Sequence, residues 1–203
     1  MRAIAVEIER SPAPLPPAVW MLPDRGVVGM VSFIIAESAI FTIVVVAYLF
    51  YLGKSQSGPT PREVLEVPVF YTVCLLCSSA TIHLAAKRLG RGEPRSFLVL
   101  WMLTLLLGGL FLYGTAQEWH RLIYQHGLTI STNLFGTTYY SLVGLHALHV
   151  TVGLAMIAIV FVLAAAGRVG TVHLGRVDVL SLYWHFVDVV WVVVFTVVYV
   201  IGR

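Results

Sequence analysis

The chain has 203 residues, of which 59% are hydrophobic and 11% charged, and its formal net charge is +3. Soluble domains carry roughly 25% charged residues, so this composition excludes an ordinary soluble protein and indicates an integral membrane protein. The small net charge and the absence of a long basic run in the sequence argue against nucleic acid as a partner. The two cysteines, Cys74 and Cys77, are too few for a disulfide scaffold.

The first 26 residues are predicted to form a Pro-rich tail. The opening MRAIAVEIER does not resemble a cleaved signal, because Glu7 and Glu9 interrupt the place where an apolar region should begin. The stretch SPAPLPPAVWMLP, residues 11–23, is typical of an extended, poorly structured lead-in.

Five segments are long and apolar enough to cross a membrane, which takes about 20 residues at 1.5 Å each. They run over approximately 27–52, 67–89, 96–122, 137–166 and 179–201. All nine prolines lie before residue 95, so none interrupts the last three segments. We therefore expect an all-α fold, with residues 27–203 forming one integral membrane bundle of five transmembrane helices.

The positive charges are distributed unequally between the two sides that five spans define. Nine lie in the tail and in the second and fourth loops: Arg2, Arg10, Arg25, Lys87, Arg88, Arg91, Arg95, Arg168 and Arg176. Four lie on the other side: Lys54, Arg62, Arg121 and Arg203. The positive-inside rule then predicts a cytoplasmic N-terminus and an external C-terminus.

The first span, VSFIIAESAIFTIVVV, contains one ionisable residue, Glu37. It lies about 15 Å from the helix start, where a charge costs a few kcal/mol and so requires a partner or a purpose. Because burial disfavours the charged form of a carboxyl group, we expect the bundle to keep Glu37 protonated or hydrogen-bonded, with His146 or His149 as its partner.

Further polar residues recur in the other four spans. In chain order they are Ser79 and His83, then Glu118 in GTAQEWHR, then His146 and His149 in LVGLHALHV, and finally His185 and Asp188 in SLYWHFVDVVW. The simplest interpretation is a network of interhelical hydrogen bonds that fixes which faces meet. Trp119, Trp184, Trp191 and Arg121 are candidates for contacts with lipid or with the interface.

None of these residues forms a recognisable catalytic or cofactor site. His146 and His149, three positions apart, lack matching histidines on a paired helix, and Cys74 and Cys77 lie mid-helix without nearby ligands. There is no glycine-rich phosphate loop or nucleophile motif in the sequence. We expect no catalytic centre, metal or cofactor bound by this chain itself.

Several blocks taken together resemble subunit III of the haem–copper oxidases, most closely the cytochrome c oxidase form. They are FIIAESAIFTIVVVAYLFY, CSSATIHLA, GLFLYGTAQEW, NLFGTTYYSLVGLHALHVTVGL and YWHFVDVVWVVVFTVVYVIG, which cover almost all of residues 27–202. The resemblance implies a five-helix form of a subunit that elsewhere has seven helices, in the orientation that the charges also predict.

The resemblance also implies a role and partners. The subunit would carry no haem or copper, since these reside in partner subunits, and would pack against subunit I of a complex that includes subunit II. It would hold structural phospholipid, support proton supply in a proton-translocating respiratory complex of a bacterial plasma membrane, and protect the catalytic subunit from inactivation. A larger respiratory supercomplex is a further possible partner.

Matched by position, Glu37 corresponds to the membrane-embedded glutamate of the family in its A-E-S context. His146 and His149 correspond to the family's paired histidines, and His185 and Asp188 to its final motif. Glu118 and Trp119 correspond to the E-W ending of the third span. Two departures, Thr115 where relatives often have glutamine and Ala147 where they usually have glycine, concern the hydrogen bonding between the third and fourth spans.

Alternative functions remain open at this point. The electron donor is not encoded here, so subunit III of a quinol oxidase and the accessory subunit of a nitric oxide reductase share this pattern. A small proton-coupled transporter using Glu37 and Asp188 would require an internal repeat and helices broken at the midplane, and the sequence has neither. A purely structural membrane scaffold differs from the oxidase subunit only in whether Glu37 matters for turnover.

Overall fold

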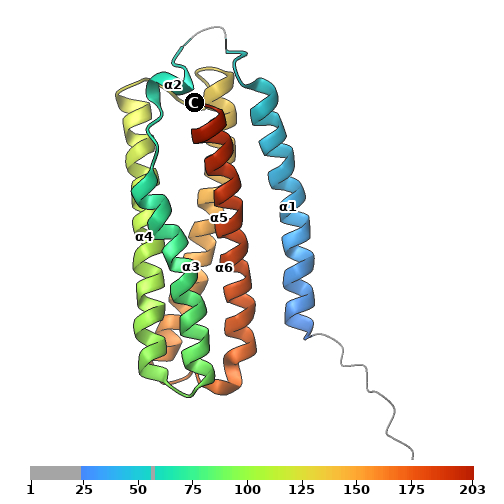
Figure 1. Cartoon of the computed structure of the whole chain (residues 1–203), viewed down its shortest axis with the longest axis vertical. Coiled ribbons are helices and arrows are strands. Elements are labelled where there is room, and N and C mark those ends of the chain that lie inside the picture. The colour runs from blue at the N-terminus through green and yellow to red at the C-terminus, as the bar shows by residue number, and fades with distance from the viewer. Residues whose placement is uncertain (1–23, 56–57) are drawn as a thin grey trace, which may run out of the picture.

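The computed structural model describes residues 24–55 and 58–203 and places five long helices in one bundle (Figure 1). All five are long and apolar enough to span a membrane, which confirms the predicted all-α architecture. The elements are α1 (Arg25–Tyr51), α2 (Pro61–Val64), α3 (Val69–Gly90), α4 (Pro94–Tyr124), α5 (Leu134–Ala165), the 3₁₀ turn η1 (Thr171–His173), α6 (Leu174–Phe195) and the π-helix η2 (Thr196–Ile201). The orientation in the membrane stays a prediction.

Two features near the helix ends were not predicted. The single turn α2 follows the first span, where a Thr60–Glu63 capping box and Pro61 at the first position favour a helix start. The fifth span begins earlier than expected, at Thr171. Most of the predicted tail, residues 1–23, lies outside the described residues, and α1 begins at Arg25.

Side-chain caps and glycine turns set the limits of the spans. The Asp24 carboxylate accepts a hydrogen bond from the Gly26 N–H at 2.7 Å, and the Asn133 side chain accepts one from the Gly136 N–H at 2.8 Å. Between α3 and α4, Gly92 has a φ of +73°, a conformation that side-chain-bearing residues rarely adopt. This tight turn makes α3 and α4 an antiparallel hairpin.

Helix α1 lies at the edge of the bundle, where it packs mainly against α5 and α6 (Figure 1). Only Phe41 and Tyr48 of this helix are buried within the chain. Many of its other large apolar side chains, among them Ile35 and Ile43, are exposed, whereas Met30, Val44 and Val45 are partly buried against the core. One end of the bundle contains α2, the C-terminus and the last residues of α1 and α4. It is called the α2 end below.

Indole rings fill the centre of the bundle. Trp101 and Trp184 are fully buried, and Trp191 is 1% exposed. Trp184 fits against two glycines: a Cβ atom added at Gly108 would lie 3.0 Å from its ring, and one at Gly153 would lie 2.8 Å away. The small residues thus let α4 and α5 approach α6 closely.

The burial of Trp184 and Trp191 corrects one expectation. Both were predicted to contact lipid or the interface, as tryptophans at membrane boundaries often do. Instead both rings lie inside the bundle, with their indole N–H groups bonded to hydroxyl groups of α3: Trp184 to Ser78 at 2.9 Å and Trp191 to Thr72 at 3.1 Å. A polar side chain on a neighbouring helix therefore makes an interior position suitable for each indole.

The neighbouring glycines of α4 provide a matched test of this packing. We expect Gly108→Ala to destabilise the bundle by about 1–3 kcal/mol, because the new methyl group meets Trp184 and Leu154. Gly109→Ala is the control: a Cβ atom there has nothing within 4 Å. It should be neutral, or stabilise the helix by about 0.5–1 kcal/mol. SDS titration of the detergent-solubilised protein measures both effects, and equal behaviour of the two variants would contradict the packing described.

Candidate functional site

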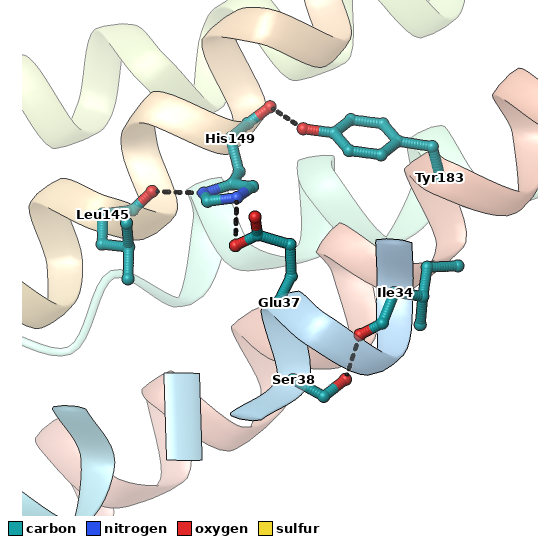
Figure 2. A network of polar contacts seen from close by, with 6 residues as sticks. All are labelled: Ile34, Glu37, Ser38, Leu145, His149 and Tyr183. Carbon is teal, nitrogen blue, oxygen red and sulfur yellow. Dashed lines mark hydrogen bonds and ion pairs between the residues drawn. The ribbon is translucent and has the colours of Figure 1, made fainter. Parts of the chain in front are cut away.

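Glu37 of α1 meets His149 of α5 inside the membrane-spanning part of the bundle (Figure 2). The Glu37 Oε2 and His149 Nε2 atoms are 3.1 Å apart, and the two side chains are 18% and 11% exposed. This confirms the expectation that a histidine of the fourth span is the partner of Glu37. It is the only side-chain hydrogen bond from α1 to another helix within residues 24–55 and 58–203.

The other ring nitrogen of His149 determines how many protons the contact holds. His149 Nδ1 lies 2.8 Å from the Leu145 carbonyl oxygen, which can only accept, so Nδ1 carries a hydrogen. In the neutral ring, Nε2 is then a bare acceptor, and Glu37 must be the protonated donor. In the charged ring, Nε2 donates to the Glu37 carboxylate. Either way one proton lies between the two side chains, and the pair has no net charge.

Neighbouring groups orient this pair. The Tyr183 hydroxyl of α6 donates to the His149 backbone carbonyl at 3.0 Å, and the Phe41 ring lies 5.1 Å from the His149 ring. The Ser38 hydroxyl turns away from Glu37 and donates to the Ile34 carbonyl at 2.7 Å, as Figure 2 shows. Three helices thus position the pair, while the partial exposure of Glu37 leaves its carboxyl group accessible from one side.

His146 does not belong to this pair or to any hydrogen-bond network. It is fully buried, and neither ring nitrogen has a hydrogen-bond partner in the described part of the chain. Its ring stacks on Trp191 with centroids 4.9 Å apart and meets the edge of Phe111 at 5.8 Å. The prediction of a polar network role for His146 is therefore wrong. The two histidines share one broad face of α5, but their offset around the helix axis places His149 against α1 and His146 against Phe111 of α4 and Trp191 of α6.

A second set of polar residues joins α3 to α6. The Ser79 hydroxyl lies 2.6 Å from His185 Nδ1, and the rings of His83 and His185 have centroids 6.3 Å apart. Asp188 is 4% exposed and lies beside Ser79, although neither carboxyl oxygen has a well-formed hydrogen bond within the described ranges. The predicted residues of these two spans therefore come together around Ser79 and His185.

A third set lies toward the α2 end. The Tyr199 hydroxyl of η2 donates to Glu118 Oε2 of α4 at 2.8 Å. Arg121 forms an ion pair with Glu66, and this contact lowers the pKa of the exposed Glu66 carboxyl group below its usual value. Trp119 is partly buried, with its ring 5.5 Å from that of Tyr140. Glu118 and Arg121 were predicted from the sequence, but Glu66 was not, because no motif marks its exposed position before α3.

Potential metal ligands do not gather in the described part of the chain: no group of three or more His, Cys, Asp or Glu residues occurs there in a suitable arrangement. Cys74 is buried and Cys77 exposed, and both are free thiols.

Comparison with known proteins assigns this arrangement to a family. The model of the family described as cytochrome c oxidase subunit III matches residues 23–203. This chain belongs to the cytochrome c oxidase subunit III family. It is the subunit III of a haem–copper oxidase, and its five spans make it a multi-pass membrane protein.

Individual subunit III relatives cover most of the chain. It is 39% identical to "Cytochrome c oxidase subunit 3" of Synechocystis sp. over 88% of this chain and 77% of the relative. It is 32% identical to the protein of the same name from Alkalihalophilus pseudofirmus, covering 86% and 85%. It is also 32% identical to "Cytochrome bo(3) ubiquinol oxidase subunit 3" of Pseudomonas aeruginosa, covering 87% and 85%. The family thus includes subunits named for both electron donors.

Removing one partner of the central pair tests its geometry. We expect His149→Leu to destabilise the bundle by about 1–3 kcal/mol, because it leaves the Glu37 carboxyl group without a partner at membrane depth. The double variant Glu37→Leu/His149→Leu should regain most of that loss, since both polar groups are then removed. SDS titration of the wild type, the two single variants Glu37→Leu and His149→Leu, and the double variant measures the coupling energy between the two side chains. Additive losses of stability would show that the pair does not interact.

Proposed function

We propose that this subunit III supports proton uptake and turnover stability in a proton-pumping haem–copper terminal oxidase of aerobic respiration, without a redox centre of its own. The observation that supports this role is the Glu37–His149 pair, which holds one proton inside the membrane-spanning region. A proton can move between Glu37 Oε2 and His149 Nε2 without a change in the net charge of the pair. That is a low-cost way to keep a transferable proton in a lipid environment.

We also propose partners, and the family membership and the outer surface of α1 support them. We propose that the chain packs against subunit I, which carries the oxygen-reducing centre, in a complex that also contains subunit II, and that phospholipid binds to it. The outward-facing apolar side chains of α1, such as Phe33, Ile35 and Ile43, provide a surface for such contacts. A larger respiratory supercomplex is compatible with the same surface.

Cytochrome c is the electron donor that we propose. Relatives named as cytochrome c oxidase subunits, at 31–39% identity, include the one from Synechocystis sp. at 39%, and two relatives named as quinol oxidase subunits are 30% and 32% identical. The bacterial plasma membrane is the proposed location, with the N-terminus in the cytoplasm according to the distribution of arginine and lysine.

Affinity purification of the complex, followed by an optical spectrum and a subunit inventory, tests the electron donor. Haem a together with a copper-binding subunit II would support cytochrome c as the donor. Haem b and haem o without that copper would contradict it.

The substitution Glu37→Gln tests the proton role directly. The amide that replaces the carboxyl group can still donate to His149 Nε2, so we expect the complex to assemble normally. The amide cannot release a proton, so proton uptake during turnover should slow measurably, and the enzyme should inactivate earlier. Stopped-flow measurement of proton uptake with a pH indicator provides the readout.

Ser38→Ala is the matched control for this experiment. Its hydroxyl is adjacent in sequence but bonds only to the Ile34 carbonyl, so uptake should remain unchanged. Loss of the complex in Glu37→Gln would assign Glu37 to structure, and normal uptake in an intact Glu37→Gln complex would remove the proposed proton role.

A further inference from the structure

A second buried carboxyl group lies near the α2 end, away from the pair at Glu37. Glu118 of α4 accepts a hydrogen bond from Tyr199 on Oε2, but its Oε1 atom is buried and has no hydrogen-bond partner within the described ranges of the chain. Tyr199 lies on η2, the only π-helical segment of the described chain. Such segments occur mostly as local departures from α-helix at functional sites.

Three more buried polar atoms lie close to Glu118. Tyr139 Oη and Trp119 Nε1 lie near one another without a well-formed hydrogen bond, and Arg121 Nε is inaccessible and has no hydrogen-bond partner in the described part of the molecule. Tyr139, which is fully buried, lies next to Glu118, Trp119 and Tyr199, so the groups converge from α4, α5 and η2. Their chemistry is complementary: Trp119 and Arg121 donate, Glu118 Oε1 accepts, and the Tyr139 hydroxyl does both.

Such a convergence is unusual for a folded protein. About 90% or more of buried polar groups are hydrogen-bonded to protein or to ordered water, so Glu118 Oε1 and Arg121 Nε, with the incompletely bonded Tyr139 and Trp119 beside them, require an explanation. Because the set contains donors and acceptors, it matches the requirement of bound water, which typically makes about three hydrogen bonds. An apolar ligand would leave Glu118 Oε1 and Arg121 Nε without partners, and an anion would be repelled by an ionised Glu118.

The same carboxyl group borders an opening to the outside. A pocket of about 390 Å³ lies between the start of α3 and the end of α4, and its lining includes Glu118, Arg121, Glu66, Gln117 and Tyr71. This volume has room for several water molecules, each of which takes up about 30 Å³ in the liquid. The exposed Glu66, paired with Arg121, brings the rim of the pocket to the surface.

We propose that bound water joins Glu118 to this pocket, and that Glu118 exchanges its proton with the aqueous phase at the α2 end. In this exchange the proton leaves a Glu118 carboxyl oxygen for a neighbouring water, which passes one of its own protons into the pocket, and the reverse steps reprotonate the carboxylate. The titratable groups that face Glu118 are Arg121 on its own helix, Tyr139 from α5, Tyr199 from η2 and Glu66 before α3. This site does not depend on the role of Glu37.

X-ray radiolytic labelling of the purified oxidase complex tests the water. Hydroxyl radicals generated from bound water label buried side chains next to it. We expect Tyr139 to be labelled faster than Tyr183, because bound water lies beside Tyr139. Tyr183 is the matched control, since it is 2% exposed and its hydroxyl is bonded to the His149 carbonyl. Equal labelling of the two tyrosines would overturn the proposal.

Infrared spectroscopy of the same complex tests proton exchange. The carboxylic acid band of Glu118 is the C=O band that is present in the wild type and missing in Glu118→Gln. We expect this band to disappear when the pH of the medium is raised and to return within seconds when it is lowered. Asp188 is the comparison, because it is buried and does not line this pocket. Its band is obtained from the difference between the wild-type and Asp188→Asn spectra. That band should respond to pH far more slowly than the Glu118 band. A Glu118 band that does not change with the pH of the medium would overturn the proposal. The absence of this band at every pH would also overturn it.

Discussion

The cost of a carboxyl group at membrane depth is the constraint on which this structure depends. Helix α1 has few buried residues of its own, and Glu37 provides its one side-chain hydrogen bond to another helix within the described residues. A bare carboxylate there would cost several kcal/mol, so the contact must be neutral as a whole. The Nδ1–H group of His149, held by the Leu145 carbonyl, produces that neutrality by requiring one proton between the two side chains. The same geometry that secures α1 therefore also stores a proton.

The rest of the bundle follows a related rule, in which hydrogen-bond donors find acceptors on neighbouring helices. The three central indole groups donate to Ser78, Thr72 and the Ile157 carbonyl, and in doing so they connect α6 to α3 and α4 to α5. Gly108 and Gly153 make room for Trp184 between these helices. Without a hydrophobic difference between lipid and protein interior, close packing and such hydrogen bonds hold the helices together.

Much of the fold could be predicted from the sequence because length and apolar composition determine membrane spans almost alone. The pairing of Glu37 with a histidine of the fourth span was also predictable, since a buried carboxyl group requires a partner. Which histidine it would be was not predictable. His146 and His149 are three residues apart on a helix that is apolar all round, so no pattern of polar and apolar residues marks its inward face.

The same ambiguity explains the error at Trp184 and Trp191. An indole ring is equally suitable for a membrane boundary and for an interior with a hydroxyl group nearby, and the hydroxyls of Ser78 and Thr72 lie more than 100 positions earlier in the chain. The polar groups around Glu118 also come from three distant segments. Only the folded arrangement brings Tyr139 and Tyr199 next to that carboxyl group.

Nitrogen NMR of His149 in the ¹⁵N-histidine-labelled complex tests whether the pair holds its proton as described, with the signal assigned by its loss in His149→Asn. The contact with the Leu145 carbonyl requires that Nδ1 carries a hydrogen. The contact with Glu37 requires that Nε2 shows a hydrogen bond that Glu37→Gln alters. A neutral ring with hydrogen on Nε2 and a bare Nδ1 would contradict this arrangement of the proton. Glu37 would then be an anion in the membrane, and the pair would not hold the transferable proton described.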